Sequence, residues 1–180
     1  MGFFEDYFKT VCEKVAQVEA GSLEAACRYL KEAAKKRKKV IIAGNGGSAA
    51  ISSHVSVDLT KNAGIRAINF NEYDLITCFA NDYGYEKWLE KSLQAYAEPD
   101  DVIILISSSG ASANIINAAR KAKEMGLIVI TFSGFSKDNP LKGLGDLNLW
   151  VDSSEYNIVE TVHQVWLLAL ADKLAGENKR

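Results

Sequence analysis

Apolar positions in the first 37 residues recur every three or four places, which predicts two helices ahead of any strand. The first pattern covers residues 3–20, with apolar side chains at Phe4, Tyr7, Phe8, Val11, Val15 and Val18. Ser22 is the expected N-cap of the second helix, which ends in the basic run 35–39. Cations at a helix C-terminus are stabilised by the helix dipole, and we favour this interpretation of the run over a nucleic-acid-binding patch.

From residue 38 onward, short apolar runs alternate with helical patterns. Strands are expected at 39–43, 66–70, 102–106, 127–133 and 147–151, and helices at 48–62, within 73–97, at 112–125 and at 156–175. Continuously apolar strands that alternate with helices are typical of a parallel sheet covered on both faces. Because no linker or repeat interrupts the chain, we expect one domain over residues 1–180, with N-terminal helices in 1–37 and an α/β core in 38–180.

Two loops rich in glycine and serine follow the two most apolar strands. The first reads Gly44-Asn45-Gly46-Gly47-Ser48, and the second reads Ser107-Ser108-Ser109-Gly110-Ala111-Ser112-Ala113-Asn114. Each precedes a helix, so small residues, hydroxyls and free backbone N–H groups gather at a helix N-terminus, as in a phosphate site. The carboxyl ends of parallel strands share one edge, where ligands bind. Tight turns and helix caps are the structural alternative for these residues.

A dinucleotide site is the runner-up interpretation of the first loop. Gly44, Gly46 and Ala49 fit the relaxed fingerprint of such sites, and Glu72 could contact a ribose. The second loop is unnecessary for a dinucleotide, however, and its four serines suit a single phosphate and sugar hydroxyls better. We therefore expect a phosphosugar ligand and no nucleotide cofactor.

Composition and charge limit the classes of function and the cellular location that we expect. The chain is 48% apolar and 24% charged, and its net charge of −2 argues against a nucleic-acid-binding surface. No apolar run approaches the length of a membrane span, and acids replace the bases of a secretory signal, so we expect a cytoplasmic protein without membrane contact. Cys12, Cys27 and Cys78 lack a metal-binding or redox spacing and are expected to be buried thiols.

Three motifs together resemble one family. Both glycine–serine loops and the segment Cys78-Phe79-Ala80-Asn81-Asp82-Tyr83-Gly84 are similar to the sugar-isomerase (SIS) domain, and more narrowly to its phosphoheptose isomerase branch. The resemblance runs in order over nearly the whole chain. It implies a flavodoxin-like, three-layer αβα fold with a five-stranded parallel sheet. It also implies a homotetramer with active sites between subunits, in which the N-terminal helices take part in oligomerisation.

The resemblance further implies an aldose–ketose isomerase that converts sedoheptulose 7-phosphate to D-glycero-D-manno-heptose 7-phosphate through an enediol. The residues that would bind substrate are Asn45, Gly46, Gly47, Ser48, Asp82, Ser107, Ser108, Ser109 and Ser112. An enediol mechanism needs a base that moves a proton between adjacent carbons, and an acid or metal near the two oxygens.

The expected catalytic residues are His54, Asp58 and Glu160, which are also the candidate ligands of a zinc ion. The family carries a His and, four residues later, a Glu on the helix after the first loop, where this chain has His54 and Asp58. Their spacing places both on one helical face. Aspartate is one methylene shorter than glutamate. On the last helix Glu160 replaces the family's Gln, and His163 is expected to pack rather than to react.

Leu168 occupies the position where the family has a second histidine. Leucine neither transfers a proton nor binds a metal, so two functions compete. In the first, His54, Asp58 and Glu160 still form an acid–base or metal site of an isomerase. In the second, the chain is a non-catalytic module that binds a phosphosugar or a protein partner.

Overall fold

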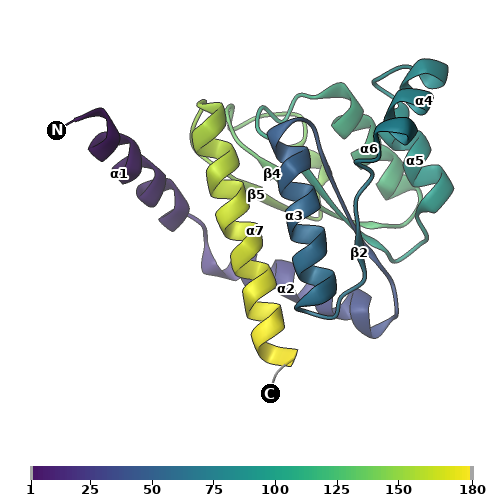
Figure 1. Cartoon of the computed structure of the whole chain (residues 1–180), viewed down its shortest axis with the longest axis horizontal. Coiled ribbons are helices and arrows are strands. Elements are labelled where there is room, and N and C mark those ends of the chain that lie inside the picture. The colour runs from purple at the N-terminus through teal and green to yellow at the C-terminus, as the bar shows by residue number, and fades with distance from the viewer. Residues whose placement is uncertain (1, 179–180) are drawn as a thin grey trace.

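The computed structural model describes residues 2–178, in which five strands form one parallel sheet between helices. The strand order is β2-β1-β3-β4-β5, with β1 (Val40–Gly44), β2 (Ala67–Ile68), β3 (Val102–Ser107), β4 (Ile128–Ser133) and β5 (Leu147–Trp150). The helices are α1 (Phe3–Ala16), α2 (Ala20–Lys35), α3 (Gly47–Lys61), α4 (Tyr73–Tyr83), α5 (Trp88–Tyr96), α6 (Ala113–Glu124), α7 (Tyr156–Asn178) and the short 3₁₀ helix η1 (Lys142–Leu144). The expected three-layer αβα fold is confirmed (Figure 1).

The alternation of side chains along each strand divides the core into two layers. Val40 and Ile42 of β1 pack with α2, α3 and α7, whereas Ile41 and Ala43 pack with α5 and α6 on the other face. Every residue of β1 and β3 is buried, as expected for central strands covered on both sides. The sheet thereby holds the loops that follow β1 and β3 next to each other, because the two strands pair in register from Val40 with Val102.

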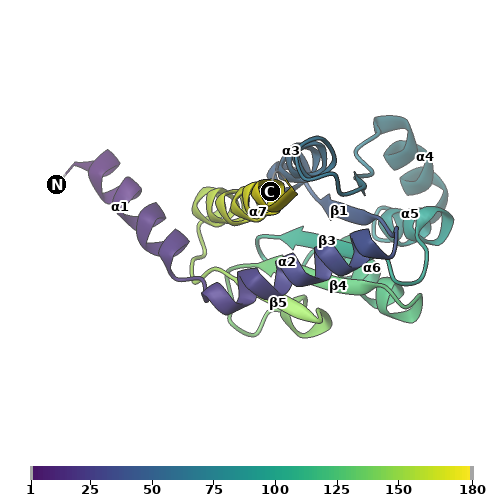
Figure 2. The same ribbon diagram turned by 90° about the horizontal axis from the view of Figure 1, so that it is seen from below.

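Helix α1 extends away from the sheet (Figure 2). None of its residues is buried, and Phe3, Phe4 and Phe8 are 74%, 70% and 61% exposed. The indole Nε1 of Trp166 on α7 donates a hydrogen bond to the carbonyl of Val15 at 2.9 Å and fixes the end of α1. The first helix therefore presents an aromatic surface that its own chain does not cover.

Several boundaries differ from the sequence-based expectation. Helix α1 ends at Ala16 rather than near residue 20, and α2 begins at Ala20 with Glu19 as its N-cap. Ser22 is thus not the N-cap but lies in the first turn, where its backbone N–H bonds the carbonyl of Glu19 at 2.9 Å. Strand β2 has two residues instead of five because it pairs only with the start of β1 at the sheet edge.

The expectation of three buried thiols is wrong for two cysteines. Cys12 and Cys78 are exposed, since α1 packs on little of the chain and Cys78 lies on the solvent side of α4. Cys27 is buried between α2 and the sheet, and burial raises the pKa of its thiol.

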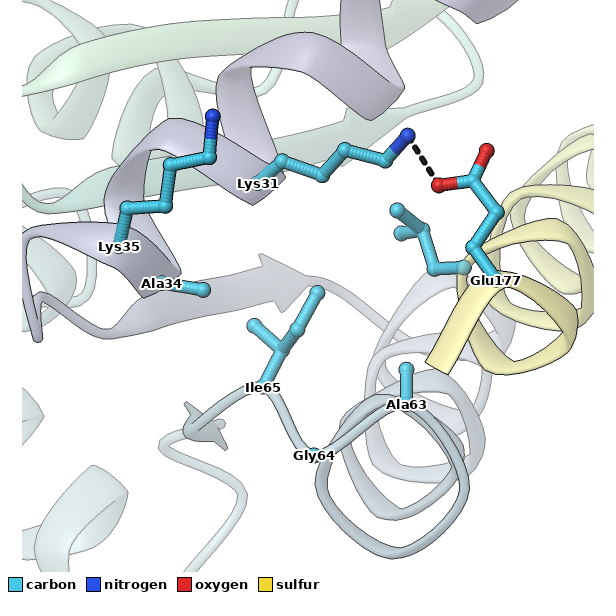
Figure 3. A pocket seen from close by; sticks show the side chains of 8 residues that line it. Lys31, Ala34, Lys35, Ala63, Gly64, Ile65 and Glu177 are labelled. Carbon is cyan, nitrogen blue, oxygen red and sulfur yellow. Dashed lines mark ion pairs between the residues drawn. The ribbon is translucent and has the colours of Figure 1, made fainter. Parts of the chain in front are cut away.

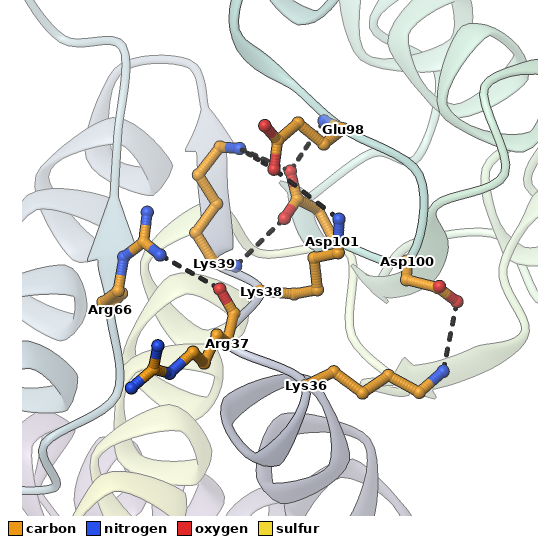
Figure 4. A network of polar contacts seen from close by, with 8 residues as sticks. All are labelled: Lys36, Arg37, Lys38, Lys39, Arg66, Glu98, Asp100 and Asp101. Atoms are coloured by element: carbon orange, nitrogen blue, oxygen red, sulfur yellow. Dashed lines mark hydrogen bonds and ion pairs between the residues drawn. The ribbon is translucent and has the colours of Figure 1, made fainter.

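The basic run after α2 packs onto the loop before β3 (Figure 4). Lys36 forms an ion pair with Asp100 at 3.2 Å, and Lys39 forms one at 2.7 Å with Asp101, which is fully buried. Arg37 adopts a left-handed conformation with φ of 59°, and its carbonyl accepts a hydrogen bond from Arg66. These contacts support the interpretation of the run as the charged end of a helix.

Candidate active site

Two asparagines join the glycine–serine loops. The Asn45 amide donates to the Asn114 Oδ1 at 2.9 Å, and the Asn114 amide donates back to the Asn45 Oδ1 at 2.8 Å. The Tyr85 hydroxyl donates to the same Asn45 oxygen at 3.1 Å. Because Asn45 follows β1 and Asn114 lies on α6, this reciprocal pair fixes the two loops relative to each other.

A cavity of about 90 Å³ opens between the two loops. Its lining consists of Asn45, Ser48, Ile106, Ser107, Ser108, Ser109, Ser112, Tyr156 and Glu160. That volume is large enough for a small tetrahedral anion. The Ser108 hydroxyl is buried and has no hydrogen-bond partner within residues 2–178, so it is available to a ligand.

The helices that begin at this cavity leave their first N–H groups uncapped by side chains. At the start of α6, Ser112 accepts a hydrogen bond from the Ser107 hydroxyl at 3.3 Å and makes no cap bond. At the start of α3, the N-cap is Gly46, whose φ of 53° is accessible to glycine at little cost. Two helix N-termini directed at one small, hydroxyl-lined cavity favour a phosphate group.

Glu160 packs directly over the backbone at the start of α3. A Cβ atom at Gly47 would overlap the Glu160 Oε2 atom, so only glycine permits this approach. A carboxylate at a helix N-terminus is stabilised by the dipole. Glycine at position 47 therefore serves to admit a carboxylate from α7 beside the phosphate cavity.

A larger cavity of about 570 Å³ lies between α3, α7 and α1 and meets the small one at Glu160. Its lining consists of Tyr7, Gly47, Ala50, Ile51, His54, Asn157, Glu160, Thr161 and Gln164. The His54 Nε2 lies 3.4 Å from the Asp58 Oδ2, as their helical spacing predicts. The Gln164 Nε2 lies 3.4 Å from the His54 Nδ1. The acid–base pair of His54 and Asp58 therefore lies further along α3, beyond the N-terminal end of the helix, which borders the hydroxyl-rich cavity.

The structure brings together most of the residues expected at the site. Asn45, Glu160 and all five of the expected serines line the small cavity, and Gly47, His54 and Glu160 line the larger one. Asp58 is connected to them through His54. Asp82 lines neither cavity, because α4 is set apart from them and its carboxylate accepts a hydrogen bond from Asn81.

Several residues at the site were not assigned a role from the sequence, among them Tyr7, Asn114, Tyr156 and Gln164. A local signal existed for Tyr156 and Gln164, which lie one helical turn before and after Glu160 on α7, and for Asn114, which ends the second glycine–serine loop. Tyr7 reaches the site only because α1 packs on α7.

The donor set does not fit the expected zinc site. Among residues 2–178, no group of three or more His, Cys, Asp or Glu side chains is close enough to hold a metal ion. His54 and Asp58 form a pair, and Glu160 lies near the start of α3 rather than beside them. One chain therefore supplies two adjacent donors where structural and catalytic zinc sites use at least three.

His163 is a structural residue, as expected. Its ring is fully buried, its Nε2 lies 3.1 Å from the Ser133 carbonyl, and it packs edge-on against Phe132. Burial lowers the pKa of His163 to about 4. The ring is consequently neutral near pH 7, and its Nε2 donates to Ser133.

Another cavity, of about 350 Å³, lies at the opposite edge of the sheet between α2, the loop after α3 and the end of α7 (Figure 3). Lys31 and Glu177 form an ion pair across it, and Ala63 and Ile65 line its floor. Lys35, also in its lining, is paired with Glu32 at 2.7 Å. Its charged groups are therefore engaged with one another and do not converge on a ligand.

No helix in the described part of the chain is long and apolar enough to span a bilayer.

Known proteins resemble this chain in sequence and in fold. The sequence model of the SIS domain matches residues 3–134. The phosphoheptose isomerase of Campylobacter concisus is 35% identical over 167 residues, which are 88% of this chain and 86% of that protein. That of Helicobacter pylori strain 26695 is 31% identical over 170 residues, covering 91% and 88%.

A solved phosphoheptose isomerase from Francisella tularensis superimposes with a TM-score of 0.88 at 24% identity, covering 97% of this chain and 98% of that one. The Neisseria gonorrhoeae enzyme superimposes with a TM-score of 0.86 at 23% identity, covering 94% and 95%. These likenesses confirm the fold. The matched sequence model and the relatives above 30% identity show the family: this chain belongs to the SIS domain family, alongside the phosphoheptose isomerases.

Proposed function

We propose that this chain is a phosphoheptose isomerase, which interconverts sedoheptulose 7-phosphate and D-glycero-D-manno-heptose 7-phosphate. The observation that carries the proposal is the junction at Glu160 of a hydroxyl-lined anion cavity with a larger cavity that contains His54. Relatives named phosphoheptose isomerase that match over more than four-fifths of the chain support it.

The phosphate would bind in the small cavity. Ser48, Ser107 and Ser108 are buried there and offer hydroxyls, while the first turns of α3 and α6 offer backbone N–H groups. No lysine or arginine lines this cavity, so helix dipoles and neutral donors carry the recognition. Because Glu160 lines both cavities, the sugar would extend past it from the small cavity into the larger one.

The length of the site favours a long sugar. Asp58 follows Ser48 by ten residues on α3, which is about 15 Å along the helix axis, and His54 follows by about 9 Å. Side chains lean toward the helix N-terminus, which brings the Asp58 carboxylate closer. The six carbon–carbon bonds of a heptose extend over at most about 9 Å, and the phosphate ester adds to this. A triose phosphate in the same cavity would stop short of both groups.

The chemistry needs only proton transfers. Asp58 would remove the proton from the carbon next to the carbonyl and return it to the neighbouring carbon, and His54 beside it would give a proton to one sugar oxygen and take one from the other through its Nε2. Glu160 would hold a hydroxyl of the bound sugar. Because the substrate carbons exchange oxidation states within one molecule, no nucleotide cofactor takes part. We derive no step through zinc, since the donors in this chain do not form a site for it.

We also propose that the protein self-associates, with sites completed between subunits of a homotetramer. The support is the aromatic surface of α1, where Phe3, Phe4 and Phe8 are exposed next to the larger cavity that Tyr7 lines. We further propose that the reaction takes place in the cytoplasm. A dianionic sugar phosphate is retained there because it cannot cross a bilayer.

Leu168 is the observation that favours the second candidate, a phosphosugar-binding module without turnover. Its side chain packs against the core cluster of α2, α3 and α7, and it offers no proton. In that case the phosphate cavity would be used for sensing alone.

Purified protein mixed with sedoheptulose 7-phosphate, with and without added zinc, tests both candidates when aldoheptose 7-phosphate is followed by NMR. We expect turnover in the wild type, none in Asp58→Asn, and a raised KM in Ser109→Ala. Ser22→Ala, in the first turn of α2 away from both cavities, is the matched control and keeps wild-type constants. Thermal stabilisation by the sugar phosphate without any product would refute the isomerase and establish the binding module.

A further inference from the structure

We infer that Gln164 is a positioning residue that fixes the tautomer and the ring orientation of His54. The inference about the ring stands on geometry alone, and only its catalytic consequence rests on the proposed function. Gln164 lies on α7, His54 lies on α3, and the two helices run side by side (Figure 1). The contact between them is the 3.4 Å approach of the Gln164 amide nitrogen to the His54 Nδ1.

The other ring nitrogen of His54 is engaged as well. Its Nε2 lies 3.4 Å from the Asp58 Oδ2, and the second oxygen of Asp58 accepts a hydrogen bond from Asn62 at 3.2 Å. An ionised carboxylate only accepts hydrogen bonds, so a neutral His54 ring that donates to Asp58 carries its proton on Nε2. Nδ1 is then an acceptor, and the Gln164 amide must present its NH₂ group to it.

An amide is suited to a ring that changes its protonation state. When His54 is neutral, the NH₂ group of Gln164 donates to Nδ1; when the ring takes up a proton, a rotation of the amide presents Oε1 to the new Nδ1–H. A carboxylate at position 164 could serve only a protonated Nδ1, and an aliphatic side chain could serve neither form. The amide therefore keeps the ring plane constant through a proton-transfer cycle, with Nε2 directed at Asp58.

The position of Gln164 also limits its role. It lines the larger cavity one helical turn beyond Glu160, and the phosphate cavity does not include it. It should consequently influence the rate of proton transfer more than the capture of the phosphate. Partners of a metal-bound imidazole that orient it through its second nitrogen contribute about 10- to 100-fold to activity, and we expect an effect of the same order on the orientation of His54.

Ring ¹⁵N chemical shifts of labelled protein at pH 8 test the tautomer directly. The chain has only two histidines, and His163 is an internal reference for the Nε2–H form because its Nε2 donates to the Ser133 carbonyl. We expect wild-type His54 to show the same Nε2–H pattern as His163. In Gln164→Glu we expect His54 to lose that pattern, in favour of Nδ1–H or of a doubly protonated ring, while His163 keeps it.

Gln94→Glu on α5 makes the same chemical change far from both cavities and is the matched control, in which both rings keep the wild-type pattern. In kinetic assays we expect Gln164→Glu and Gln164→Leu to lower kcat at least tenfold with KM within about twofold. A wild-type His54 pattern in Gln164→Glu overturns the inference. Absence of turnover in the wild type refutes the proposed function and leaves the tautomer result standing, so the two failures are distinguishable.

Discussion

The buried ring of His163 should make the fold lose stability in mild acid. Desolvation lowers its pKa from the usual 6.5 to about 4, and the hydrogen bond to Ser133 opposes this only in part. In the unfolded chain the ring is hydrated and titrates near 6.5. Between pH 6.5 and 4 the unfolded state therefore binds more protons, and the free energy of unfolding falls as the pH falls. The difference between the two pKa values corresponds to a contribution of about 3 kcal/mol to the free energy of unfolding. This contribution is present in full above pH 6.5 and is lost by pH 4.

Urea unfolding at several pH values between 4 and 8 measures this contribution. The amide in His163→Gln can donate to Ser133 but does not titrate. Subtracting the free energies of unfolding of this variant from those of the wild type therefore cancels the pH-dependent contributions of the carboxylates, which both proteins share. We expect the difference to fall by about 3 kcal/mol from pH 7 to pH 4. Gln94→Asn, an exposed amide on α5 that does not titrate, is the control and should keep the wild-type dependence. Parallel curves for the wild type and His163→Gln would show that desolvation of this ring does not govern acid stability.

Four further substitutions, one of them a control, test the contacts of the site and the core. Gly47→Ala should lower kcat at least tenfold, because the added methyl group displaces the Glu160 carboxylate. Gly21→Ala is the control: its methyl group meets open space in a helix, so activity should be unchanged and the free energy of unfolding in urea should rise by about 0.5–1 kcal/mol. Asn45→Ala should raise KM for the sugar phosphate about tenfold, as measured in initial-rate assays, because the loops lose their amide pair. Asp101→Asn should cost about 3 kcal/mol in urea unfolding, since the buried carboxylate that pairs with Lys39 is lost and an amide cannot accept the backbone hydrogen bonds of both Lys39 and Glu98.

The central strands could be predicted from the sequence because burial on both faces leaves a plain pattern. Residues 40–44 and 102–107 are apolar almost without interruption, and all of them are buried. Strand β2 could not be delimited in the same way. Only two of its residues pair with β1, and the following Asn69 turns its side chain back to the backbone N–H of Asn71. The length of an edge strand depends on such side-chain hydrogen bonds to the backbone, which compete with strand pairing and leave no trace in the apolar periodicity of the sequence.

The same distinction holds within the site. The serine loops and the pair of His54 and Asp58 were predictable because their chemistry lies within a few residues of one helix or turn. The bond of Asn45 to Asn114 spans 69 residues, and that of Gln164 to His54 spans 110. No local pattern encodes contacts of that range, which arise from the pairing of β1 with β3 and the packing of α3 on α7.

Two of the three departures from the family pattern that the resemblance implies, those at Asp58 and Leu168, fall at one level of the site. Helices α3 and α7 run in the same direction: Gly47 meets Glu160 near their starts, and His54 meets Gln164 further along. One helical turn beyond that contact, α3 carries Asp58 and α7 carries Leu168, at the positions where the family resemblance implies a glutamate and a histidine. The Asp58 carboxylate turns toward His54, and Leu168 packs against the core cluster. The polar contact between α3 and α7 is therefore made one turn earlier, by His54 and Gln164.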